Sequence, residues 1–147
     1  MIPVELAARL RDAGLEWAPG PGDRFVVVDR GMDEDVFVIS TMTVDVHELP
    51  ARTVIGFNGT VEWALDDVDV EAALWLPRES QLRELLGPAF VRLERVDPPT
   101  GGTGGAEYRV VATIWAEAVT FPDRDPEAAY GRALLHLLTG GPHRPGG

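Results

Sequence analysis

The sequence contains no cysteine and no lysine. Without thiols the chain has no disulfide framework, no thiolate zinc site and no cysteine nucleophile. All 13 basic residues are therefore arginine, and Asn58 is the only asparagine. Because lysine and asparagine need A-rich codons, this bias indicates a GC-rich genome, and we do not interpret the arginines as selected for bidentate contacts.

Long hydrophobic runs are also missing. Charged residues at Glu5, Arg9, Arg11 and Asp12 interrupt the N-terminal segment, so it lacks the apolar run of a signal peptide. No uncharged stretch approaches the roughly 18 residues that a membrane helix needs. We therefore expect a cytoplasmic protein without a membrane partner.

The 147 residues are 45% hydrophobic and 25% charged, which is the composition of a globular domain. We expect one domain over residues 1–139 and a disordered Gly/Pro-rich tail over 140–147. The net charge is −11, and residues 1–73 hold 15 acidic residues against five arginines, which leaves −10 in that half. This charge disfavours nucleic-acid partners, because it repels phosphate groups. Its role is to keep the protein soluble, or else to attract a basic protein partner or to mimic a nucleic acid.

Three segments have the apolar spacing and end signals of helices. Gly14 and Gly87 are placed to end the first two, and Asp125 with Pro126 is placed to begin the third. The predicted helices are residues 3–13, 78–86 and 126–138.

Strand-forming runs occupy much of the remaining chain. They are residues 24–29, 36–40, 41–47, the two flanks of Asn58-Gly59, 89–96 and 107–121, with 66–71 either a half-strand or an acidic loop. The second and third runs are either one bent strand or a pair joined by a tight turn. The order predicts an α+β fold with a single antiparallel sheet of about six to seven strands and three helices packed mainly on one face.

The Asn58-Gly59 pair predicts a two-residue type I′ hairpin turn. Pairing outward from this turn places Val54 opposite Trp63 and Ile55 opposite Glu62. The face with Trp63 is apolar, so we expect its indole in the core, with a ligand platform as the alternative. Ile55 and Phe57 belong to the other, partly exposed face.

Two kinds of function follow. The first is a non-enzymatic accessory or protein-interaction module whose outer sheet face meets a partner, which the charge favours as a basic one. Its predicted contact residues are Asp45, His47, Ile55, Phe57 and Glu62.

The second is a small-ligand-binding protein or enzyme with a pocket between the sheet and the 78–86 helix. Its walls would be Trp63, Trp75 and Trp115, with Glu62 or His47 as the acid/base. Against catalysis, the chain has no G-x-S-x-G elbow, no phosphate-binding loop and no His spacing typical of zinc, and "DDVDVE" lacks the glycine and glutamate of a calcium loop. We therefore expect no catalytic residues, no metal and no cofactor.

Five segments, "ELAARLRDAGLEW", "RFVVVDR", "VIGFNGTVEWALD", "WLPRESQLRELLG" and "PEAAYGRALLHLL", together resemble a family of small proteins of unknown function from high-GC actinobacteria. Members of that family often carry the label pilus assembly protein. The similarity covers most of the chain between Val4 and Leu138. It implies one intact domain and a bacterial source, and it assigns no activity.

Overall fold

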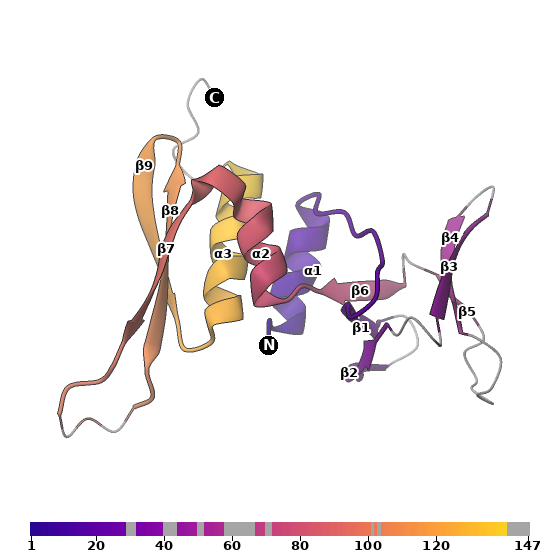
Figure 1. Cartoon of the computed structure of the whole chain (residues 1–147), viewed down its shortest axis with the longest axis horizontal. Helices are drawn as coiled ribbons and strands as arrows, with labels where there is room; N and C mark the ends of the chain where they lie inside the picture. Colours follow the sequence, from indigo (N-terminus) through magenta and orange to yellow (C-terminus); the bar gives the residue numbers. More distant parts are fainter. Residues whose placement is uncertain are drawn as a thin grey trace. The chain divides into compact units, whose positions relative to one another are not determined.

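The computed structural model describes residues 1–28, 32–39, 44–49, 52–57, 67–69, 72–100, 102 and 104–140. The chain divides into two compact units: unit 1 comprises Met1–Leu15 and Pro77–Gly147, and unit 2 comprises Glu16–Leu76 (Figure 1). The prediction of one domain over 1–139 stays a prediction, because two compact units can belong to one cooperatively folding domain. Of the predicted tail, residues 141–147 lie outside the described residues.

The α+β class predicted from the sequence is confirmed, but the single sheet of six to seven strands is wrong. The described strands form three antiparallel sheets of three strands each, in the orders β2-β1-β6, β3-β4-β5 and β7-β8-β9. Periodicity identifies a strand but does not determine its neighbours, so a chain rich in short strands is equally compatible with one sheet or with several.

Unit 1 combines the third sheet with all three α-helices. Helix α3 packs against β8 and β9, and α1 and α2 pack against α3. The helices therefore lie on one face of this sheet (Figure 1). The elements are α1 (Val4–Asp12), α2 (Glu79–Leu86), the 3-10 turn Gly87–Ala89, β7 (Phe90–Val96), β8 (Glu107–Ile114), β9 (Glu117–Asp123) and α3 (Pro126–Thr139).

Helices α1 and α3 approach each other closely at Gly131. A Cβ atom added there would lie 2.8 Å from Leu6 Cδ2 and 3.0 Å from Ile2 Cδ1. Leu6 and Ile2 are themselves buried, together with Leu10 of α1 and with Ala133 and Leu134 of α3. The absence of a side chain at Gly131 is what lets the two apolar faces meet.

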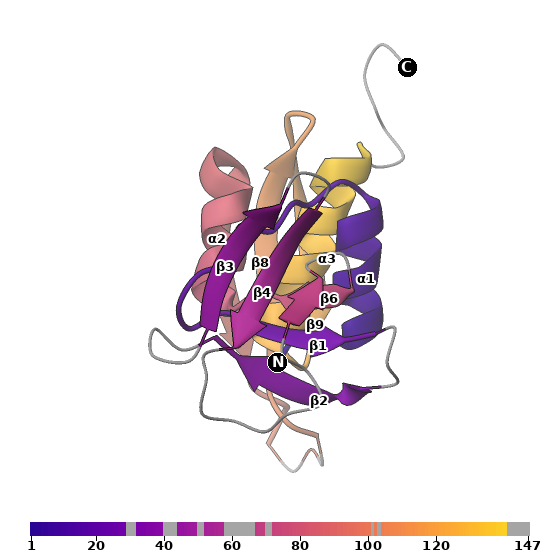
Figure 2. The ribbon, with the colours of Figure 1, turned by 90° about the vertical axis from the view of Figure 1, so that its right-hand side faces the viewer.

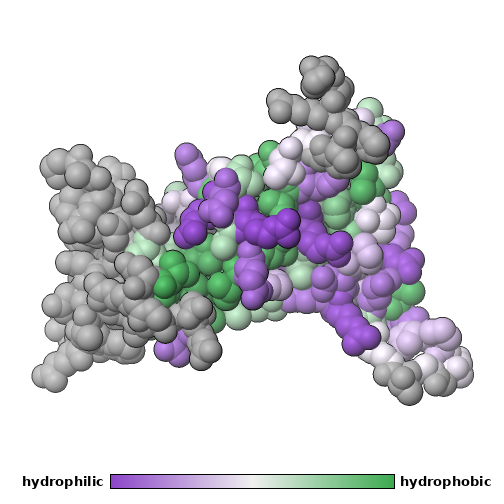
Figure 3. Space-filling model, turned by 180° about the vertical axis from the view of Figure 1, so that it is seen from behind, coloured by the Kyte–Doolittle hydropathy of each residue, from purple (hydrophilic) through white to green (hydrophobic). Residues whose placement is uncertain are grey.

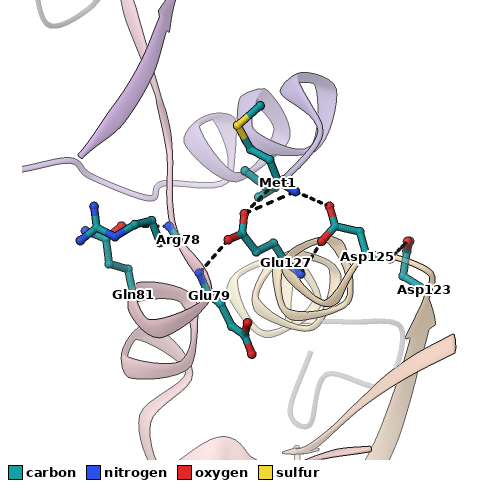
Figure 4. A network of polar contacts seen from close by, with 8 residues as sticks. Met1, Arg78, Glu79, Gln81, Asp123, Asp125 and Glu127 are labelled. Carbon is teal, nitrogen blue, oxygen red and sulfur yellow. Dashed lines mark hydrogen bonds and ion pairs between the residues drawn. The ribbon is translucent and has the colours of Figure 1, made fainter. Parts of the chain in front are cut away.

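The N-termini of the helices share one carboxylate (Figure 4). Glu127 Oε1 accepts from the backbone N–H of Ile2 at 3.0 Å, and Glu127 Oε2 accepts from that of Glu79, the first residue of α2, at 3.2 Å. Asp125 caps α3 as predicted, because its Oδ1 accepts from the N–H of Glu127 at 2.9 Å. Met1 N lies 2.8 Å from Asp125 Oδ2. These carboxylates satisfy N–H groups that have no partner within their own helices.

Strands β8 and β9 are joined by a two-residue turn that the sequence analysis missed. Ile114 pairs with Glu117, and the intervening Trp115 and Ala116 have φ angles of +54° and +67°. Two consecutive positive φ values are typical of a type I′ turn, which usually contains Asn-Gly. The predicted strand 107–121 is therefore two strands. The indole Nε1 of Trp115 donates to the carbonyl oxygen of Gly140, the C-cap of α3.

Unit 2 contains the other two sheets. Its strands are β1 (Arg24–Val27), β2 (Met32–Val38), β3 (Val44–Leu49), β4 (Arg52–Phe57), β5 (Asp67–Asp69) and β6 (Ala73–Leu76). Strand β1 is central in the first sheet, and its residues Phe25, Val26 and Val27 are fully buried. Because successive residues of a strand point to opposite faces, β1 is covered on both faces.

The predicted pairing around Asn58-Gly59 is wrong. Strand β4 pairs with β5, so Val54 lies opposite Asp69 and Ile55 opposite Val68, rather than opposite Trp63 and Glu62. Residues 58–66 lie outside the described residues. Local turn preference proposes a register, but the pairing of whole strands decides it. The half-strand alternative for 66–71 holds for Asp67–Asp69.

Neither alternative for residues 36–47 holds. Strand β2 belongs to the sheet with β1 and β6, whereas β3 pairs with β4, beside which it lies in Figure 2. The two runs are therefore separate strands of different sheets. Among the described helices, none has both the length and the apolar character to cross a membrane.

We expect Ala116→Gly to stabilise the protein by about 1 kcal/mol, because glycine adopts the positive φ of +67° without Cβ strain. The matched control is Ala118→Gly, an exposed position in β9 with no such strain. That variant should lose about 0.5–1 kcal/mol. Urea unfolding followed by circular dichroism measures both, and equal destabilisation by the two glycines would contradict the strained turn.

We expect Glu127→Gln to destabilise the protein by about 1–2 kcal/mol, because the amide replaces one of two carboxylate acceptors with a donor that faces a backbone N–H. Glu84→Gln removes the same charge from an exposed site on α2. It should change the free energy of unfolding by less than about 0.5 kcal/mol. Thermal and urea unfolding of the two variants check the difference, and equal stabilities would show that the shared cap is unimportant.

Candidate functional site

The residues predicted to contact a partner do not all belong to one face. Asp45 and His47 of β3 pair with Gly56 and Val54, whereas Ile55 and Phe57 of β4 pair with Val46 and Val44. Residues directly opposite each other share a face, and alternate residues of a strand belong to opposite faces. Asp45 and His47 therefore hold positions on one face, and Ile55 and Phe57 hold positions on the other. Glu62 lies outside the described residues.

Of the predicted pocket walls, Trp75 and Trp115 belong to different units, and the pocket itself stays a prediction. Trp75 stacks on Trp17 within unit 2, with ring centroids 6.3 Å apart and planes 7° from parallel. Trp115 belongs to unit 1, where its indole is bonded to Gly140. Trp63 lies outside the described residues. Helix α2 packs on α3, and its buried residues are Leu82 and Leu86.

The stacked tryptophans of unit 2 are held by a buried acid. Asp23 is only 5% exposed, and its Oδ2 accepts from Trp17 Nε1 at 2.9 Å and from the N–H of Gly20 at 3.0 Å. Trp17 also contacts Phe25, with centroids 5.8 Å apart. A buried carboxylate that accepts two hydrogen bonds orders the local chain, so this cluster is structural.

A groove of about 630 Å³ lies within unit 1, between the C-terminal halves of α1 and α3 and beside β9. Its floor is apolar and its rim carries both charges. Figure 3 shows hydrophilic and hydrophobic residues interspersed over the described part of one face of the molecule. The lining residues are Arg9, Asp12, Ala13, Phe121, Arg132, Leu135, His136 and Thr139.

Side-chain contacts fix part of this groove. Phe121 is 7% exposed, and the His136 ring meets it edge-on with centroids 5.4 Å apart. Arg132 Nη1 donates to the carbonyl oxygen of Pro122. Thr139 Oγ1 donates to the carbonyl oxygen of Leu135 at 2.9 Å, so its proton is already used. The groove thus presents guanidinium and imidazole groups above an aromatic floor.

Sequence reasoning missed this groove. Arg9 and Asp12 of α1 and its C-cap Ala13 have helical spacing, and Arg132, Leu135, His136 and Thr139 have it on α3. Such spacing indicates that each set shares a helix face. Nothing in the sequence indicates that these two faces, more than 110 residues apart, border one groove. Within the described part of the chain, no three His, Asp or Glu side chains are grouped to hold a metal ion.

Tyr130, in α3, is a fully buried titratable side chain of unit 1. Burial raises the pKa of its hydroxyl above the ordinary value, Glu79 raises that pKa further, and Arg83 opposes both. Its ring packs against Phe90 with centroids 5.6 Å apart. Its hydroxyl makes no hydrogen bond of standard geometry with the described residues. A raised pKa keeps this group protonated at neutral pH, so it is unsuited to act as a base.

We expect Tyr130→Phe to leave stability unchanged or to raise it by up to about 1 kcal/mol at pH 7, because the buried hydroxyl that is removed makes no hydrogen bond of standard geometry. Above pH 10 the unfolded tyrosine ionises before the folded one, so the wild type loses stability there and the variant loses less. Urea unfolding at pH 7 and at pH 10.5 checks both expectations, with Tyr108→Phe in β8 as the control. A loss of more than about 1 kcal/mol at pH 7 would mean that the hydroxyl has a partner.

The chain matches no protein-family model, and no curated protein or solved structure is detectably similar to it.

Proposed function

We propose that the chain is a non-enzymatic accessory protein that binds a basic protein partner through unit 2. The observation that carries this proposal is the separation of charge between the units. Residues 16–76 hold 13 acidic residues and three arginines, a net charge of −10, whereas the remaining residues hold 11 acidic residues and ten arginines, a net charge of −1.

Charge concentrated in one unit acts differently from charge spread for solubility. It creates a directional field that accelerates encounter with a partner of opposite sign and weakens as ionic strength rises. Unit 1, which is nearly neutral, supplies no comparable field. The interaction should therefore be salt-dependent and should map to residues 16–76.

Strand β2 supplies apolar contact beside this charge. It lies at an edge of the sheet β2-β1-β6, and its residues Val36 and Val38 are 40% and 59% exposed. The segment Asp33–Asp35 immediately precedes them in the chain. An edge strand with exposed β-branched residues suits a partner that adds a strand or lays an extended segment along it.

Two triple variants with the same net charge test the location of the interaction. The first, Asp33→Asn/Glu34→Gln/Asp35→Asn, neutralises acids of unit 2. The second, Glu84→Gln/Asp97→Asn/Glu117→Gln, neutralises exposed acids of unit 1. Each protein is immobilised and used to capture partners from a bacterial lysate at 50 and 500 mM salt, and the affinity of each purified partner is then measured.

We expect a partner retained at low salt to bind the first variant about tenfold more weakly, since three charges at a protein interface contribute about 0.5 kcal/mol each. The second variant should bind within about twofold of the wild type. Equal weakening of both variants would contradict a role for unit 2. Retention of no basic, salt-sensitive partner would contradict the proposed function.

A further inference from the structure

The groove between α1 and α3 has the chemistry of a ligand site that is separate from the acidic unit. We propose that it binds a small organic anion, namely a carboxylate joined to a planar aromatic or branched apolar body. Its volume of about 630 Å³ falls within the roughly 300–1,000 Å³ typical of small-molecule sites. That size suits a ligand of one or two rings.

Two arginines provide donors for the anionic end. Arg9, in the last turn of α1, forms no ion pair with the residues that the structure describes. Arg132 donates through Nη1 to Pro122, and its distance of 3.9 Å to Asp123 Oδ2 is at the limit of an ion pair. Each guanidinium has five N–H donors in a planar fork that matches a carboxylate, so both retain donors for a ligand.

The floor provides the surface for the apolar end. Phe121 is buried beneath the groove, and Leu135 lines it from α3 while remaining partly exposed. The imidazole of His136 stands edge-on to Phe121 and is itself partly exposed, so Leu135 and the His136 ring form the surface open to a ligand, with the buried Phe121 supporting them from below. A ligand with a planar apolar body would cover this surface and gain from its removal from water.

Asp12 is the one groove residue that opposes an anion. Its side chain is 74% exposed, and its Oδ1 lies 3.7 Å from Arg11 Nε, so it is only weakly neutralised. With Arg9 and Arg132 the groove still carries a net positive charge. Asp12 therefore allows a test of whether the ligand is an anion. Removal of an arginine should weaken the binding of an anion, and removal of the Asp12 carboxylate should strengthen it.

The probes are 2-naphthoate and its neutral isostere 2-naphthamide, titrated into the 15N-labelled full chain and followed by 1H–15N NMR. The variants are Arg9→Gln, Arg132→Gln and Asp12→Asn. Arg124→Gln, at an exposed position outside the groove, is the control for the arginines, and Glu84→Gln is the control for Asp12. Thermal unfolding of each variant confirms that it is folded.

We expect naphthoate to bind about fivefold more tightly than naphthamide. The amide signals that change chemical shift should be those of Arg9–Ala13, Phe121 and Leu135–Thr139. Arg9→Gln and Arg132→Gln should each lower the affinity for naphthoate about three- to tenfold and change the affinity for naphthamide less than about twofold. Asp12→Asn should raise the affinity for naphthoate about twofold, and both control variants should bind naphthoate with the affinity of the wild type.

Equal affinity for the two probes, shifts outside the groove, or no shifts at 10 mM naphthoate would each overturn the proposal. If Arg132→Gln unfolds because its bond to Pro122 is lost, the opposite effects of Arg9→Gln and Asp12→Asn still decide the question. The site does not depend on the proposed partner. The unit 2 triple variant should therefore bind naphthoate like the wild type.

Discussion

The Glu127 carboxylate is the constraint on which the arrangement of unit 1 depends. It accepts from Ile2, just before α1, and from Glu79, at the start of α2, while its own N–H is bonded to the Asp125 cap of α3. Two neighbouring carboxylates, Glu127 for α1 and α2 and Asp125 for α3, therefore fix where the three helices begin. Because α1 and α3 start at the same point and meet at Gly131, their C-terminal halves also come together, and the groove forms between those halves.

The two units differ in what they offer a binding partner. Unit 1 is nearly neutral and places a few charged side chains around an apolar floor, which favours selection of a ligand by shape and local charge. Unit 2 carries −10 of the net charge of −11 and exposes valines on an edge strand, which favours a larger partner of opposite charge.

The sequence allowed correct prediction of features set by short-range interactions, such as helix starts. It did not allow prediction of the pairing between strands that are distant in the chain. Asp125 and Pro126 begin α3 as expected, since a cap acts on N–H groups within the same turn. The register predicted from Asn58-Gly59 was wrong, because the pairing of β4 with β5 outweighs a local turn preference. Trp115-Ala116 forms a two-residue turn without either favoured residue, so no turn signal was there to find. The groove needs α1 and α3 together, which periodicity within each helix does not encode.

The Trp115-Ala116 turn contacts the end of α3, beside the groove. Two non-glycine residues at positive φ cost on the order of 1–2 kcal/mol each, so surrounding contacts must hold them there. The indole of Trp115 provides such a contact by donating to Gly140, which follows directly on Thr139 of the groove. The strained turn thereby ties the β8-β9 hairpin to the end of α3. Since Leu135, His136 and Thr139 all lie in the last turns of that helix, the same contact limits fraying where the groove needs a fixed wall.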